Sequence, residues 1–167
     1  MRKTMLAALL ALAVPAAAAF AADEPPSPTD LAQAACRSEK AQMGTRTFKA
    51  TYAATNTSAA TTACVVKRDG GAESALKNAA KACKAERAAD PAAFTTKYGT
   101  NKNGKNAYGK CVSAKARGVT GQQTTARVNA AKACKKLKAE QPADFKSTYG
   151  TTKNAFGKCV SKMAKAS

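Results

Sequence analysis

Apolar side chains recur at helical spacing toward the C-terminus of the chain. The positions i, i+3, i+4 and i+7 of one stripe are Phe156, Cys159, Val160 and Met163. Such a stripe is typical of a helix that buries one face. An earlier segment repeats the stripe with Tyr108, Cys111 and Val112, and has Lys115 in the fourth position. The pattern predicts two helices, each with a cysteine on its buried face.

Two further helices are predicted before each of these. The first is expected over 72–89 and again over 124–139, where alanines and a cysteine share one face. The second begins at Asp90-Pro91, an N-cap followed by proline at the first helical position. It ends at Tyr98-Gly99, where glycine can adopt the left-handed conformation. Three short helices per unit are therefore predicted, and the fold class is all-α.

These units are copies of one another. Segment 129–165 aligns with 78–117 at 23 identical positions of 37, with one three-residue gap. The octet KNAYGKCV at 105–112 recurs as KNAFGKCV at 153–160, and a fainter copy precedes both units. Internal duplication predicts tandem helical modules. Their bounds are 30–66 for the degenerate first copy, 72–117 for the second and 124–167 for the third, with glycine-containing linkers or turns over 67–71 and 117–123.

Each copy contains two cysteines, one on its first helix and one on its third. An even number of cysteines in an exported chain is typical of a disulfide framework. A metal site is disfavoured because the chain has no histidine and no C-x-x-C pair. The six cysteines permit several pairings, and the repetition favours pairing inside each copy. The expected disulfides are Cys36–Cys64, Cys83–Cys111 and Cys134–Cys159.

The first 21 residues have the features of a secretory signal peptide. Two basic residues precede an Ala/Leu-rich run that closes on Ala19-Phe20-Ala21, with small residues at the −3 and −1 positions of a cleavage site. An uncleaved membrane anchor is disfavoured because Pro15 interrupts the apolar run. We expect residues 1–21 to be cleaved, 22–29 to form a flexible leader, and no transmembrane segment to remain. The protein is then periplasmic or secreted to the extracellular space.

Large apolar residues are scarce, and positive charge is abundant. The 146 residues after residue 21 include three Leu, six Val, four Phe and no Ile, so a single large core is not expected. Disulfides are the expected compensation. The chain has 28 basic and 10 acidic residues, and removal of Arg2 and Lys3 leaves a net charge of +16. Lysine makes up 20 of the remaining 26 basic residues, which favours diffuse attraction to polyanions.

Most familiar catalytic arrangements are missing from the sequence. Without histidine there is no Ser-His or Cys-His pair, and the glycines match no phosphate-binding loop. Two carboxylate pairs, Glu86 with Asp90 and Glu140 with Asp144, would suit glycoside cleavage. Their simpler interpretation is negative charge at helix starts and on a solvated face. The sequence predicts a protein without enzymatic activity, cofactor or metal, unless a cysteine is free and reactive.

Two other features allow a functional interpretation. Gly109 and Gly157 occupy equivalent places in the third helix, and packing against the Phe/Tyr pair of the second helix is favoured over approach of a ligand. Tyr98 and Tyr108, with lysines between them, could form a basic aromatic surface for single-stranded nucleic acid. Both tyrosines also occupy stripe positions, so core packing is their favoured role.

Lysines in and beside the polar bends are the candidate anion-binding residues. They are Lys97, Lys102, Lys105, Lys110, Lys153 and Lys158. Several such contacts would release counterions from a polyanion, and linked copies would add avidity. The expected function is low-specificity binding of an anionic polymer: a wall phosphopolymer, an acidic polysaccharide, an anionic lipid surface or extracellular nucleic acid. The alternative is a structural or adhesive spacer of the cell envelope.

The repeated unit resembles that of small exported bacterial proteins of unknown function with AC…F…YGTN…NAFGKCVS repeats. The matching residues are Ala82-Cys83, Phe94, 98–101 and 106–113, then Ala133-Cys134, Phe145, 149–151 and 154–161. The resemblance covers about half of the chain, and Thr152 departs from it where the earlier copy has Asn101. It implies a helical two-cysteine fold and export, and no particular activity.

Overall fold

Seven helices make up most of residues 24–166, the part of the chain that this computed structural model describes. The predicted signal peptide, residues 1–21, lies outside the described residues. The helices are α1 Pro28–Met43, α2 Thr45–Thr51, α3 Thr57–Ala89, α4 Pro91–Tyr98, α5 Ala107–Glu140, α6 Pro142–Tyr149 and α7 Ala155–Lys165. No strand accompanies them within 24–166, so the all-α prediction is confirmed. None of the seven is long and apolar enough to cross a membrane.

Local sequence signals start several helices. Side-chain oxygens of Ser27, Asn56 and Asp90 accept hydrogen bonds of 2.8 to 3.1 Å from backbone N–H groups three residues on. Helix α4 has its predicted bounds, but Gly99 has a φ of −72°, so the left-handed prediction is wrong there. The bend after Gly99 is three residues longer than that of the third copy, and Gly99, where this bend begins, has an extended backbone. The equivalent Gly150 has a φ of 86°.

The predicted linkers between the copies are helical. Helix α3 passes without a break through 67–71, and α5 passes through 117–123. Glycine inside a helix costs about 1 kcal/mol relative to alanine, but packing outweighs that cost here, because Arg68 on α3 and Thr120 on α5 are buried. The prediction of separate short helices is therefore wrong at these two joints. The third helix of one copy continues directly into the first helix of the next.

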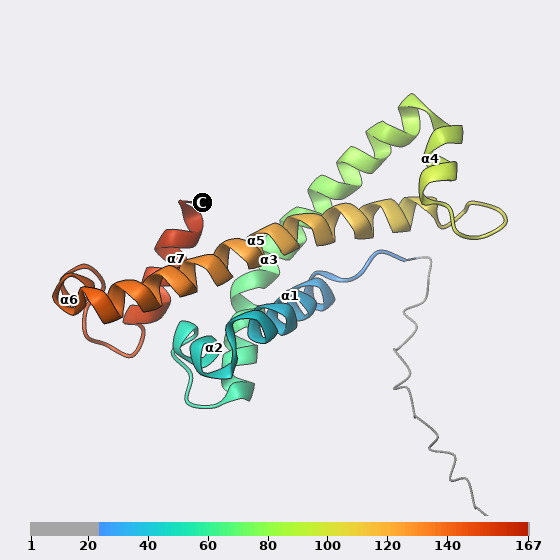
Figure 1. Cartoon of the computed structure of the whole chain (residues 1–167). Helices are drawn as coiled ribbons and strands as arrows, with labels where there is room; N and C mark the ends of the chain where they lie inside the picture. The colour runs from blue at the N-terminus through green and yellow to red at the C-terminus, as the bar shows by residue number, and fades with distance from the viewer. Residues whose placement is uncertain (1–23, 167) are drawn as a thin grey trace, which may run out of the picture.

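The two long helices, α3 and α5, cross each other, and α1 packs against both (Figure 1). Helix α4 joins α3 to α5 at one end of the molecule. Helices α6 and α7 fold back on α5 toward the other end, where α7 also contacts α2. The first and third copies are therefore in contact.

Three disulfides connect the helices, with the pairing predicted inside each copy. Cys36–Cys64 joins α1 to α3, Cys83–Cys111 joins α3 to α5, and Cys134–Cys159 joins α5 to α7. Each disulfide lies in its own small hydrophobic cluster together with one buried phenylalanine. Three clusters take the place of a single large core, as the scarcity of large apolar residues predicts.

Candidate anion-binding surface

The six candidate lysines are spread over the molecule. Lys102 and Lys105 lie in the bend between α4 and α5, Lys153 lies in the bend between α6 and α7, and the others are on helices. All are exposed except Lys110, which is partly buried. Lys110 and Lys153 line two different grooves, so the structure does not join the six into one site.

Lys97 is held by a carboxylate of its own copy. Its Nζ lies 2.8 Å from Glu86 Oε1, and Lys115 Nζ lies 3.0 Å from Oε2 of the same residue. The hydroxyl of Tyr98 is 3.2 Å from both oxygens. Hydrogen bonds from Lys97 and Lys115 lower the pKa of Glu86 to about 2, and the contact with Glu86 raises the pKa of Lys97. Lys97 is therefore the weakest of the six candidates, because its charge is partly neutralised within the protein.

The two carboxylate pairs have structural partners. Asp90 caps α4 through its side chain, while Glu86 holds the two lysines. Glu140 lies 4.0 Å from Lys136 one turn earlier, and Asp144 is in the first turn of α6. These positions agree with the simpler interpretation, helix-terminal charge and a solvated face.

The tyrosines of the second copy face the core. The Tyr108 hydroxyl donates to the carbonyl oxygen of Ala80 at 3.3 Å, and the guanidinium of Arg87 lies 5.2 Å from the centre of its ring. Tyr98 packs against Phe94 with 5.0 Å between ring centroids. No phenylalanine or tyrosine in residues 24–166 is exposed. Core packing is confirmed for both tyrosines, which are partly buried against the hydrophobic cluster of the second copy.

Gly157 packs against a different helix from the one predicted. A Cβ built on it would overlap the carbonyl oxygen of Thr51, which ends α2 in the first copy. The expected neighbours were the Phe/Tyr pair of its own copy, and the repeat pattern could not show how one copy docks on another. The equivalent Gly109 is buried in α5. The absence of a side chain at Gly157 is thus what lets α7 approach α2.

The predicted leader, 22–29, is wrong at its end, because Pro28 and Thr29 belong to α1. A groove of about 640 Å³ lies between residues 24–27, α1 and α5. Lys110 and Arg117 of α5 line it together with Arg37 of α1. Glu24 and Asp30 also line it, so its positive charge is partly balanced. We do not expect this groove to prefer anions strongly.

A smaller groove of about 380 Å³ lies where α6, the bend after it and the start of α7 meet the end of α2. Its basic residues are Lys138 of α5, Lys146 of α6 and Lys153 of the bend, and none of its lining residues is acidic. Phe145 and Phe156 supply apolar surface. We call it the third-copy groove. Sequence reasoning named Lys153 but missed the other two lysines, because it considered only lysines in and beside the polar bends.

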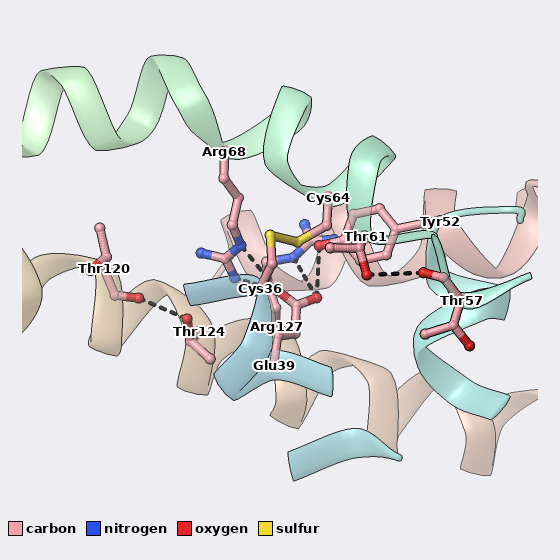
Figure 2. Close-up of a disulfide and its surroundings, with 10 residues drawn as sticks. All are labelled: Cys36, Glu39, Tyr52, Thr57, Thr61, Cys64, Arg68, Thr120, Thr124 and Arg127. Atoms are coloured by element: carbon pink, nitrogen blue, oxygen red, sulfur yellow. Dashed lines mark hydrogen bonds and ion pairs between the residues drawn. A yellow bond between two sulfur atoms is a disulfide. The ribbon is translucent and has the colours of Figure 1, made fainter. Parts of the chain in front are cut away.

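A buried ion cluster beside the Cys36–Cys64 disulfide was not predicted. Figure 2 shows Glu39 between Arg68 and Arg127, with Tyr52 beside it. Oε2 of Glu39 accepts from Arg68 Nε at 3.0 Å and also from its Nη2. Oε1 accepts from Arg127 Nε at 3.2 Å and from the Tyr52 hydroxyl at 2.9 Å. The cluster joins α1, α3 and α5, and so fixes the first copy on the long helices.

This cluster is largely buried. Glu39 is fully buried, and burial, with a smaller contribution from the Glu39 charge, raises the pKa of Tyr52 to about 12. Nη2 of Arg127 is buried without a hydrogen-bond partner among the described residues. One signal was present in the sequence: Glu39 follows Cys36 by three residues and Arg68 follows Cys64 by four, so each shares a helix face with a disulfide cysteine.

The chain matches no protein-family model, no curated protein and no solved structure. Its function is therefore inferred from its own residues.

Proposed function

We propose that the protein is exported and binds anionic polymers of the cell envelope or the extracellular space, with low specificity and without catalysis. The observation that carries this proposal is that most of its lysines are exposed and have no ion-pair partner among the described residues. Sixteen of the 20 lysines in residues 24–166 are exposed, and thirteen of these have no ion-pair partner within that part of the chain. Such a surface attracts polyanions through many weak contacts that release counterions.

The acidic residues do little to balance this charge at the surface. Glu39 is buried between two arginines, and Glu86 is taken up by two lysines. Residues 131–166 contain nine lysines and only two acidic residues, Glu140 and Asp144. Over their full bounds the third copy has ten basic and two acidic residues and the second copy has ten and three, so net positive charge is slightly higher in the third copy, and we expect polyanions to bind there first.

The exposed surface favours recognition of charge over stacking or insertion. Single-stranded nucleic acid is usually held by exposed aromatic rings, and interfacial membrane binding needs exposed apolar area. Val66 and Val119 are the only large apolar residues exposed within 24–166. Wall phosphopolymers and acidic polysaccharides fit this surface better than nucleic acid or a lipid bilayer.

Export is supported by two features. Disulfides persist in oxidising compartments outside the cytosol, and all six cysteines are in disulfides. The first 21 residues have the pattern of a cleavable signal. The proposed partners lie in the same compartment.

The test is retention of the oxidised protein on isolated cell envelope and on heparin beads over a series of salt concentrations. We expect the bound fraction to fall steeply as salt rises, because each lysine contact competes with cations. Acetylation of the lysines removes their charge and should abolish retention. Retention that stays constant over the salt series would contradict the proposal.

A structural spacer is the second candidate, and the continuity of the long helices favours it. Helix α3 has 33 residues and α5 has 34, so each spans roughly 50 Å at a rise of about 1.5 Å per residue. For a spacer, envelope association should persist after lysine acetylation. That single comparison separates the two candidates.

A further inference from the structure

The third-copy groove is open where the second copy is closed. Lys146 stands at the position that Thr95 occupies in the second copy. The longer bend of the second copy folds back over that threonine, since a Cβ on Gly104 would overlap Thr95 Cγ2. A Cβ on Gly99 would lie only 3.2 Å from the Cα of Gly104, which shows how closely the bend is folded. The third copy lacks three residues of this bend, and the equivalent space is the groove.

The charges around this place also differ between the copies. Glu86 of the second copy neutralises two lysines, whereas the aligned residue of the third copy is Leu137. No acidic residue lines the groove. Lys138, Lys146 and Lys153 have no ion-pair partner among the described residues, and all three line one space of about 380 Å³.

We propose that the third-copy groove is the principal binding site for the phosphate groups of a phosphate-bearing polymer, an inference that rests on the proposed function. Lysine binds phosphate as a point charge. Each phosphate inside such a polymer has two non-bridging oxygens that diverge from a tetrahedral phosphorus, so they can contact ammonium groups on different sides, whereas the two oxygens of a carboxylate lie in one plane with their carbon. Thr151 lines the same groove, and its hydroxyl is a further potential donor.

The test compares two variants of equal charge. One is Lys138→Gln/Lys146→Gln/Lys153→Gln. The matched control is Lys81→Gln/Lys84→Gln/Lys132→Gln, which changes three exposed lysines that do not line the groove. Binding of fluorescently labelled inorganic polyphosphate is measured by anisotropy at several salt concentrations. Circular dichroism and thiol counts establish that both variants are folded and oxidised.

We expect the groove variant to bind polyphosphate at least ~10-fold more weakly than the unmodified protein at fixed salt. Its slope of log Kd against log salt should fall by about 2, because each lost phosphate contact removes about 0.7. The control variant should change the affinity by less than ~3-fold and leave the slope nearly unchanged.

Three other results would overturn the inference in distinguishable ways. Equal losses in both variants would remove the groove assignment and leave diffuse polyanion binding, so the proposed function would stand. No binding of the unmodified protein to polyphosphate, heparin or envelope would overturn the proposed function as well. Equal affinity for poly-glutamate, with the same loss in the groove variant, would show a general anion site and overturn the preference for phosphate.

Discussion

Loss of the buried carboxylate of Glu39 should strongly destabilise the fold. Glu39→Gln keeps the size of the side chain but removes the negative charge between Arg68 and Arg127. The Glu39 side chain is 0% exposed, and those of Arg68 and Arg127 are 8% and 16% exposed. Water can therefore do little to replace the lost charge. Breaking a buried ion pair from one side costs about 3–5 kcal/mol, a large part of the roughly 5–15 kcal/mol that stabilises a typical domain.

The assay is urea unfolding at neutral pH with the disulfides intact, followed by circular dichroism. Glu73→Gln is the control, because Glu73 pairs with Lys77 at the surface and its removal should leave the unfolding midpoint nearly unchanged. Adding Arg127→Met to Glu39→Gln removes one of the orphaned charges and should recover part of the loss. If Glu39→Gln destabilises by less than about 1 kcal/mol, the cluster does not have the role described here.

Three further outcomes are expected. Gly157→Ala should lower the free energy of unfolding by about 1–3 kcal/mol relative to Gly118→Ala, because the new methyl group meets the Thr51 carbonyl, whereas a methyl group at position 118 has open space. Equal urea midpoints for the two variants would contradict this. Tyr52 should ionise near pH 12. The stability that its neutral hydroxyl contributes should be fully present below pH 10.0 and should be lost as pH rises through about 12. The last step of an absorbance titration should vanish in Tyr52→Phe, and its persistence would count against the buried hydroxyl. Stability from the Glu86 carboxylate, present above pH 4.5, should be lost as pH falls toward about 2. In Glu86→Gln, the urea midpoint should depend less on pH between about 4.5 and 2 than in the unmodified protein. The same pH dependence in both proteins would contradict the contacts of Glu86 with Lys97 and Lys115.

The parts of the fold that follow from local chemistry could be predicted from the sequence. The bounds of α4 follow from the cap at Asp90 and the proline after it, and α7 follows from its apolar stripe. The three disulfides follow from repetition, because each copy places its cysteines on facing helices. These features depend on residues that are close in sequence or repeated.

The parts that depend on contacts between copies could not be predicted. The glycines at 70, 71, 118 and 121 suggested linkers, yet packing of the long helices keeps both segments helical. Arg127 donates a hydrogen bond to Glu39 although the two residues are 88 positions apart in the sequence. The third-copy groove combines a bend three residues shorter than that of the second copy with lysines on two helices, and no local pattern contains that combination.

Charge-driven binding is the central claim, and equilibrium binding of the mature, oxidised protein to polyphosphate over a range of salt concentrations tests it most directly. We predict that log Kd rises linearly with log salt with a slope of about 2 or more, because three groove lysines alone account for about 2. A Kd that does not change with salt, or no binding even at low salt, would contradict the claim.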